Sequence, residues 1–341
     1  KNKKMFGGKF MIVNYKFENF MSFRENAEFS MMAPKTKVKV RFPNNYITAE
    51  KGGDILKTAV IVGENAGGKS NFVESLRYFK SFFGGNENIK AYRNTVNINN
   101  IKNICPKDNS TCQIFEIEIL LKGKFFYLYH LEIDYLGIVK EELSYKEQYK
   151  KKYKSLLTAI RKEYDLSCDK KDYKCKCTKE SECNINATIE YSINVSENRE
   201  KMEELLKKAA HNRMGLYVIK LALLGNEHAV EFTKWIINNL CPETNVINYD
   251  LHKSIRSEEE DLQILNDSKF IEIFKMVDPS IIEIEIDEED PFIKSLIRRK
   301  KRDGNKFSRV LGQDSSGVRE FFAWAIQIFK VIYEDKIIFA D

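Results

Sequence analysis

The sequence predicts an α/β fold, in which a mixed sheet carries a P-loop NTPase type of phosphate-binding loop, an antiparallel β meander and a mainly helical insertion. The apolar, β-branched run at residues 58–62 stops at a glycine-rich loop and is typical of a buried parallel strand. Apolar residues then recur at helical spacing from Phe72 to Phe83. Alternating apolar and polar residues predict a meander with one face in water, at residues 114–121, 125–133 and 138–145.

The composition is that of a globular protein. Of 341 residues, 43% are hydrophobic and 31% are charged, which allows one large domain or two ordinary ones. No apolar run approaches the roughly 20 residues that span a bilayer, and the basic first residues lead into no signal-type apolar core. We therefore expect a cytoplasmic protein that does not enter the membrane. The net charge of +6 is too small to argue for nucleic acid. Seven cysteines, an odd number of which three are scattered, do not predict a disulfide framework in a chain without a secretory signal.

Changes in composition divide the chain into three parts. Residues 1–145 hold the glycine-rich loop and the meander, and we expect them to form an N-terminal lobe. Residues 146–250 include a cysteine-rich patch and several apolar helical patterns, which predict the insertion. Residues 251–341 contain an alternating strand pattern at 281–286, an apolar helix at 317–333 and a final apolar strand, which predict a second lobe.

The glycine-rich loop matches the pattern G-x-x-x-x-G-K-[ST], which has a mechanical basis. Its glycines let successive backbone N–H groups turn toward phosphate oxygens, and the positive end of the following helix faces the same anion. Lys69 is then expected to reach the β- and γ-phosphates, and the Ser70 hydroxyl to hold Mg²⁺. The motif predicts an ATP site with magnesium; the alternative is a glycine-rich turn without a ligand. The predicted nucleotide ligands are Gly63, Glu64, Asn65, Ala66, Gly67, Gly68, Lys69 and Ser70.

Asp341 closes the final apolar strand, where a Walker B aspartate is expected in a protein with a P-loop. Such a carboxylate holds magnesium, often through a water molecule. The magnesium ligands predicted from the sequence are therefore Ser70 and Asp341. A strand-end aspartate at the surface is the alternative.

Three segments resemble the motifs of a known ATPase family. Residues 19–24, Asn-Phe-Met-Ser-Phe-Arg, resemble the NFRSF opening of RecF/SMC-like ATPases, residues 63–70 their Walker A loop and residues 311–319 their ABC signature loop. Together with the meander, these segments are similar to the AAA_15-type, OLD- and RloA-like ABC-class ATPases of bacterial anti-phage systems, which include PARIS-like and abortive-infection ATPases. The resemblance covers the landmarks of the whole chain except the middle insertion.

This resemblance implies an ABC-type head domain in which two copies of the chain enclose ATP, each P-loop facing the signature loop of the other copy. Ser315, Ser316 and Gly317 would then contact the γ-phosphate in trans, and Arg24 would contact nucleotide from the N-terminal strands. The simpler alternatives are an ordinary helix cap at Ser315 and a surface arginine. The resemblance also implies an ATPase that forms a homodimer or higher homo-oligomer and controls an effector or nuclease partner.

The sequence departs from this family in several places. Met21 replaces the usual arginine of the opening motif, and residues 314–318 are Asp-Ser-Ser-Gly-Val in place of Leu-Ser-Gly-Gly-Gln. Gln113 is the nearest candidate for a Q-loop glutamine, with a polar surface residue as the alternative. The family places a catalytic Glu directly after the Walker B aspartate and a switch histidine further on. We therefore expect the hydrolytic residues, and any nuclease domain, to follow Asp341.

Four cysteines lie close together in the insertion, with six, one and five residues between them. Four thiolates are a tetrahedral zinc set, but this spacing lacks the usual C-x₂-C pair. The alternatives are a structural zinc site and a segment with free thiols. The cysteines concerned are Cys168, Cys175, Cys177 and Cys183.

Two basic runs, at residues 150–154 and 298–302, are candidates for contact with a nucleic-acid backbone. Runs of this kind are more often solvated surface. DNA or RNA is therefore a partner that the sequence allows without requiring it.

We expect the chain to be the ATP-binding subunit of a bacterial anti-phage system. One alternative is a RecF/SMC-like DNA-repair ATPase that binds DNA directly; long heptad repeats beside the insertion would favour it, and the sequence has none. The other is a nucleotide-gated scaffold without catalysis, which a non-acidic residue after Asp341 would favour.

Overall fold

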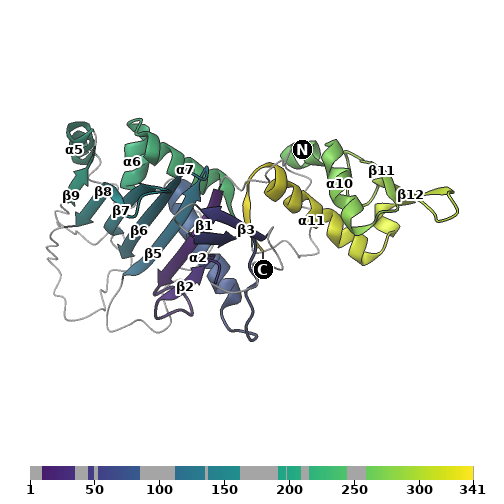
Figure 1. The fold of residues 1–341 in the computed structure, drawn as a ribbon, viewed down its shortest axis with the longest axis horizontal. Coiled ribbons are helices and arrows are strands. Elements are labelled where there is room, and N and C mark those ends of the chain that lie inside the picture. The colour runs from purple at the N-terminus through teal and green to yellow at the C-terminus, as the bar shows by residue number, and fades with distance from the viewer. Residues whose placement is uncertain are drawn as a thin grey trace, which may run out of the picture. The chain divides into compact units, whose positions relative to one another are not determined.

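The computed structural model describes residues 10–34, 45–49, 53–84, 112–134, 137–161, 191–196, 198–208, 215–243 and 259–340 (Figure 1). Contacts divide the chain into two compact units. The first comprises Lys1–Asn71 and Tyr78–Ile237, and the second Phe72–Arg77 and Asn238–Asp341. Strands and helices occur in both units, which confirms the α/β class. Within the described ranges, no helix combines the length and the apolar character needed to cross a membrane.

A seven-stranded sheet dominates the first unit, and every neighbouring pair of its strands is antiparallel. The strand order is β2-β1-β5-β6-β7-β8-β9 (Figure 1). The three central strands are the predicted meander, which is confirmed. A separate antiparallel pair consists of β3 (Tyr46–Ala49) and β4 (Gly53–Leu56). The sheet strands are β1 (Phe10–Glu18), β2 (Ala27–Ser30), β5 (Gln113–Leu121), β6 (Phe125–Asp134), β7 (Gly137–Glu147), β8 (Lys154–Arg161) and β9 (Tyr191–Val195).

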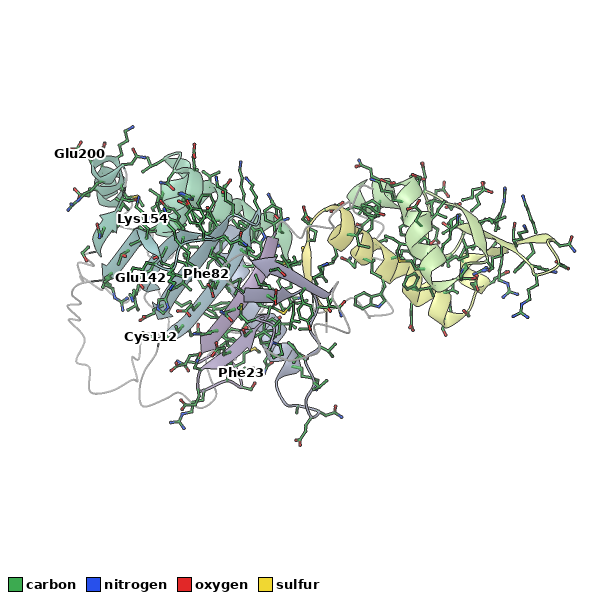
Figure 2. The ribbon with its side chains drawn as sticks, in the orientation of Figure 1. Phe23, Phe82, Cys112, Glu142, Lys154 and Glu200 are labelled. Atoms are coloured by element: carbon green, nitrogen blue, oxygen red, sulfur yellow. The ribbon has the colours of Figure 1, made fainter. Side chains whose placement is uncertain are left out.

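One face of this sheet forms the hydrophobic core of the first unit. The ring of Phe79, near the end of helix α2 (Lys69–Ser81), has its centroid 6.1 Å from that of Phe115 on β5 and 5.9 Å from that of Tyr129 on β6. Phe82, labelled in Figure 2, follows in the 3-10 turn η2 (Phe82–Gly84) and is also buried. Burying each such ring contributes about 1.5–3 kcal/mol. The helix predicted after Ser70 and its apolar stripe are thus confirmed.

The segment predicted as a mainly helical insertion, residues 146–250, contains three described helices and also extends the sheet. The prediction did not include strands β8 and β9. Strand β8 pairs with β7, and β9 pairs with β8. The helices follow the predicted apolar patterns. They are α5 (Arg199–Lys208), α6 (Tyr217–Leu223) and α7 (Glu227–Asn239).

A buried carboxylate attaches α6 to the sheet. Glu141 of β7 is fully buried and accepts hydrogen bonds from the backbone N–H groups of Tyr217, at 2.7 Å, and Val218, at 2.8 Å. The Tyr129 hydroxyl donates a third, at 3.0 Å. Burial raises the pKa of Glu141 to about 7, although all three donors act in the opposite direction. The first N–H groups of a helix need such acceptors, so Glu141 fixes the start of α6.

Charged side chains occupy part of the other face of the sheet, as the meander pattern predicts, and a smaller hydrophobic cluster with Met11 and Phe126 covers the rest. Glu116, His130 and Glu142 are cross-strand neighbours on β5, β6 and β7. The His130 ring lies between two carboxylates, with Nδ1 3.5 Å from Glu116 and Nε2 2.8 Å from Glu132. Burial lowers the pKa of His130, but these carboxylates outweigh it and raise the pKa to about 9. His130 is therefore a cation at neutral pH.

This raised pKa predicts a pH-dependent contribution to stability. The contribution of His130 to the free energy of unfolding should be complete below its ordinary pKa of 6.5. It should disappear as the pH rises through about 9, because only the folded state favours the bound proton. We expect thermal unfolding of the wild type and His130→Gln to differ most at the acidic end of that window and to converge at its alkaline end. A difference that stays constant from pH 6.5 to 9 would contradict the ion-pair assignment.

The second unit has a core of its own between α10, α11 and a three-stranded antiparallel sheet, β11-β12-β13. Phe270 and Phe274 of α10 meet Phe322 of α11, with ring centroids 5.4 and 5.5 Å apart. The predicted strand at 281–286 and helix at 317–333 are confirmed as β11 and α11. Strands β10 and β14 pair in parallel but form a sheet of their own, so the predicted mixed sheet is wrong for the described strands. The elements are β10 (Leu240–Glu243), α9 (Glu259–Leu265), α10 (Ser268–Val277), β11 (Ile281–Glu285), β12 (Leu296–Lys300), β13 (Lys306–Val310), η4 (Leu311–Gln313), α11 (Ser316–Tyr333) and β14 (Ile337–Ala340).

Candidate functional site

The glycine-rich loop has the backbone shape that its sequence predicts. Ala66 and Gly68 adopt left-handed conformations, with φ of 63° and 89°. The Gly67 N–H donates to the Glu64 carbonyl at 3.0 Å, and a Cβ on Gly67 would lie 2.9 Å from that oxygen. The close approach explains why position 67 suits glycine. Successive residues therefore turn tightly before α2 begins.

Helix α2 begins at Lys69, and among the described residues no side-chain hydrogen bond caps its N-terminus. Its N-cap residue is Gly68, which has no side chain to accept a hydrogen bond. The first N–H groups of a helix lack intrahelical acceptors and carry the positive end of the helix dipole, so they favour an anion. Residues 63–67 and Ser70 are exposed to solvent beside this N-terminus.

The Lys69 ammonium lies over the loop. Its Nζ donates to the carbonyls of Gly63, at 2.9 Å, and Glu64, at 2.8 Å. Both acceptors are neutral backbone oxygens at an exposed site, and phosphate oxygens are stronger acceptors for an ammonium group. The lysine that the motif assigns to phosphate is therefore already held at the loop.

The opening motif of residues 19–24 packs directly on this loop. The Asn71 side chain of α2 donates to the Ser22 hydroxyl at 2.8 Å. A Cβ on Gly68 would lie 2.9 Å from Ser22 Oγ and 3.1 Å from the ring of Phe23, which Figure 2 labels. Phe20 and Phe23 exchange two backbone hydrogen bonds of 2.9 Å, so the motif is a tight turn. The opening motif and the glycine-rich loop, which are far apart in the sequence, thus lie together, and Ser22 and Phe23 support the loop.

Gln113 supports the same turn from β5. It is buried, and its amide nitrogen donates to the Asn19 carbonyl at 3.2 Å. The Asn19 side chain in turn donates to the Cys112 carbonyl at 2.9 Å. The alternative of a polar surface residue at Gln113 is therefore wrong. Arg24 lies at the surface, where its Nε is 4.0 Å from a Glu25 carboxylate oxygen.

The packing against Gly68 predicts the effect of adding one methyl group there. Gly68→Ala combines a left-handed backbone with contacts to Ser22 and Phe23 that are too short. We expect a loss of about 1–3 kcal/mol in the free energy of unfolding and a displaced loop. Gly123→Ala is the matched control, because Gly123 has φ of 61° and nothing within 4 Å of its Cβ position. Equal destabilisation of both variants in denaturant unfolding would contradict the supporting role of Ser22 and Phe23.

The run at residues 58–62, before the loop, does not form the buried parallel strand that the sequence predicts. These residues belong to no strand and are exposed, with Val60 at 85% and Val62 at 84% of full exposure. A β-branched run becomes a buried strand only when neighbouring strands bond to its backbone and other side chains cover it. The prediction used the composition of the run alone and was wrong on both points.

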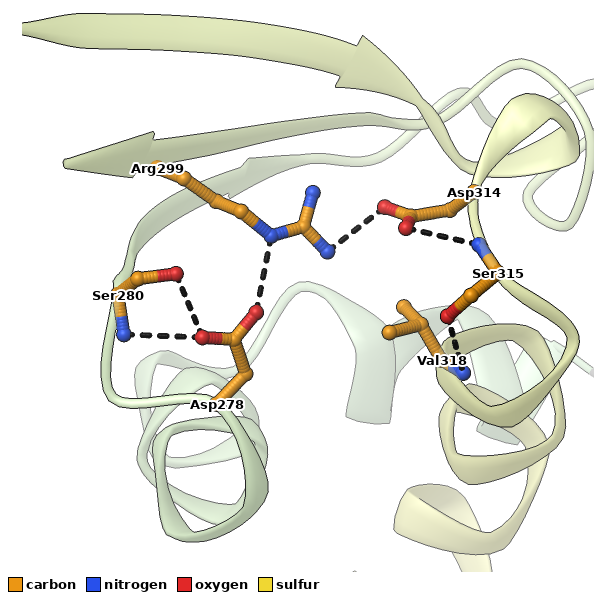
Figure 3. A network of polar contacts seen from close by, with 6 residues as sticks. All are labelled: Asp278, Ser280, Arg299, Asp314, Ser315 and Val318. Carbon is orange, nitrogen blue, oxygen red and sulfur yellow. Dashed lines mark hydrogen bonds and ion pairs between the residues drawn. The ribbon is translucent and has the colours of Figure 1, made fainter. Parts of the chain in front are cut away.

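The signature-like turn belongs to the second unit, at the start of α11. Ser315 is the N-cap of that helix, and its hydroxyl accepts the Val318 N–H at 3.4 Å. The Asp314 carboxylate accepts the Ser315 N–H at 2.9 Å (Figure 3). Ser316 and Gly317 are exposed. Ser315 thus forms the helix cap that was the simpler alternative for this turn. The predicted contact with a nucleotide in trans is not tested by this geometry.

Two predicted sites fall outside the described residues. Asp341, the proposed Walker B residue, is one, and the cysteine patch of Cys168, Cys175, Cys177 and Cys183 is the other. Among the residues that the structure describes, no group of three or more His, Cys, Asp or Glu side chains is arranged to hold a metal ion.

Some members of each basic run pair with carboxylates. Lys150 lies 2.8 Å from Glu147. Arg298 lies 2.9 Å from Glu283, and Arg299 is buried. Pairing of this kind weakens the case for nucleic-acid contact through residues 298–302.

Comparison with known proteins adds no family to this description. No family model matches the chain, and no curated protein sequence matches it.

Proposed function

We propose that residues 63–70 bind the triphosphate of a nucleotide, with ATP as the ligand and Mg²⁺ as its metal. The observation that carries this proposal is the uncapped N-terminus of α2 behind a loop with two left-handed residues, with the Lys69 ammonium held over it. A flexible surface turn without a ligand has no need of this arrangement, nor of the packing of Ser22 and Phe23 behind Gly68.

The residues present fit the phosphates and the metal. The backbone N–H groups of the loop and Lys69 would hold phosphate oxygens, and the Ser70 hydroxyl would be a magnesium ligand. Bound magnesium would neutralise charge that develops on the phosphates. Lys69 would exchange its two carbonyl acceptors in the loop for phosphate oxygens.

The family resemblance extends the proposal to pairing of two copies. Under this hypothesis the turn of Ser315, Ser316 and Gly317 meets the nucleotide of a second chain, and pairing regulates an effector or nuclease in anti-phage defence. Under the same hypothesis the protein is an ATPase. The ion pairs of Arg298 favour this function over direct DNA binding through residues 298–302.

Sedimentation velocity tests the pairing hypothesis. The full chain is measured alone, with Mg²⁺·ADP and with a Mg²⁺-bound, non-hydrolysable ATP analogue. We expect a monomer in the first two samples and a dimer in the third, because only a triphosphate presents the γ-phosphate to the second chain. Saturable binding of the analogue without any change in sedimentation would contradict the pairing hypothesis. The proposal that residues 63–70 bind the nucleotide would still stand.

A further inference from the structure

A buried arginine connects three elements of the second unit. Arg299 lies on β12 with only 7% of its side chain exposed. Its Nε donates to Asp278, directly after α10, at 2.9 Å, and its Nη2 lies 2.7 Å from Asp314, directly before the N-cap of α11 (Figure 3). A planar guanidinium with a fixed fork of donors suits two carboxylates in different directions, whereas an ammonium is a point charge. Arg299 thus joins the end of one helix to the start of another.

Asp278 anchors the guanidinium from one side. One oxygen of its carboxylate accepts the Ser280 N–H at 3.0 Å and the Ser280 hydroxyl at 2.5 Å, while the other faces Arg299. Burial raises the pKa of Asp278, but the bonds from Ser280 and Arg299 outweigh it and hold the pKa below its ordinary value. Asp278 is therefore a fixed anion, and its position determines where the Arg299 fork points.

Asp314 connects the Arg299 guanidinium to the signature-like turn. Its side chain is 8% exposed, and Arg299 lies next to the oxygen that does not bond to the Ser315 N–H. That oxygen has no well-aligned hydrogen bond among the described residues, so charge attraction to Arg299 is what holds it inside. Without this attraction a carboxylate moves toward water. The Ser315 backbone and its cap on α11 would lose their anchor.

We infer that Arg299 is the positioning residue that fixes the turn of Ser315 and Gly317 for the nucleotide of a second chain. This inference rests on the proposed function. Arg299 does not reach the exposed surface of the turn itself and acts through Asp314. Arg299, the most buried residue of the basic run 298–302, therefore has a structural role within the protein in place of a contact with nucleic acid.

Three variants test this role. Arg299→Lys keeps the charge but loses the fork, and Asp314→Asn keeps the size but loses the charge. Arg298→Met is the matched control, because Arg298 is adjacent on β12 but exposed and paired with Glu283 and Glu285. Hydrogen exchange of the Ser315 and Val318 amides reports on the turn without nucleotide, and sedimentation with the Mg²⁺-bound, non-hydrolysable ATP analogue reports on pairing.

We expect about tenfold faster exchange of these two amides in Arg299→Lys and Asp314→Asn, with unchanged exchange in the α11 segment from Phe322 onward. Pairing should weaken by about tenfold or more in both variants, while the affinity of a single chain for the nucleotide stays the same. Arg298→Met should match the wild type in all three measurements. Asp314→Asn keeps the Arg299–Asp278 pair, so it tests the role even if Arg299→Lys fails to fold.

The outcomes separate the inference from the function on which it rests. Wild-type exchange rates at Ser315 and Val318 in Asp314→Asn would overturn the inference, whatever the nucleotide does. Faster exchange together with undiminished pairing would overturn it as well. A wild type that does not pair with the analogue would overturn the pairing hypothesis and with it the role in trans, while the exchange data would still show whether Arg299 fixes the turn.

Discussion

Lys69→Ala is expected to weaken binding of Mg²⁺·ATP by about 100-fold or more, as measured by isothermal titration calorimetry. The ammonium is the one charged donor that the motif assigns to the β- and γ-phosphates, and it lies over the loop in the free protein. Hydrogen bonds to charged groups are worth about 1.5–3 kcal/mol each, and about 1.4 kcal/mol changes an affinity tenfold. Loss of two such bonds gives the expected effect.

Lys57→Ala is the control for charge alone. Lys57 is exposed and precedes the loop, so its removal changes the net charge equally without removing a phosphate ligand. We expect its affinity for ATP to stay within about twofold of the wild type, as for other exposed charges. Equal affinities for wild type, Lys57→Ala and Lys69→Ala would rule out the P-loop assignment of residues 63–70.

Glu141→Ala is expected to lower the free energy of unfolding by about 3–5 kcal/mol, the largest stability effect that we predict. The substitution removes the acceptor of three buried donors at once: the N–H groups of Tyr217 and Val218 and the Tyr129 hydroxyl. Glu141 is fully buried, so its removal leaves these donors without their acceptor and α6 loses its attachment to the sheet. Urea unfolding measures the loss.

Glu142→Ala is the matched control, one residue further along β7. Glu142 lies on the polar face with 34% of its side chain exposed and pairs with Lys140 at 2.8 Å. A surface ion pair of this kind is worth about 0–1 kcal/mol. Equal stability of Glu141→Ala and Glu142→Ala would contradict the inference that Glu141 attaches α6 to the sheet.

The contribution of Glu141 to the stability of the fold should also decrease as the pH rises. Its pKa is raised from an ordinary value of 4.5 to about 7, so the folded state resists ionisation more than the unfolded state does. The stability advantage of the wild type over Glu141→Gln is therefore greatest below pH 4.5 and declines as the pH rises through about 7. This trend has the same sign as that of His130 but occurs in a more acidic window.

The sequence was most informative where local pattern determines structure. The strict alternation around Phe115 and Ile117 predicted β5 because one face of a sheet is dry and the other wet. The apolar spacing of α2 and α11 predicted both helices for the same local reason. These patterns depend on the burial of each residue and on little else.

Non-local contacts account for what the sequence could not predict. Residues 298–302 look like a solvated basic run, but Arg299 turns inward because Asp278 and Asp314, distant in the chain, neutralise it. The support of the loop by Ser22 spans 49 residues and depends on the turn geometry of the opening motif. Composition alone does not show which charges pair or which turns meet.

Binding of the triphosphate at residues 63–70 can be measured at the backbone amides of the loop. Hydrogen exchange of the full chain is compared with and without saturating Mg²⁺·ATP, and with Lys69→Ala in parallel. We expect slower exchange at residues 64–70 in the wild type only, because these N–H groups would bond to phosphate oxygens. Unchanged exchange at residues 64–70, with the nucleotide bound elsewhere or not at all, would contradict binding of the triphosphate at this loop.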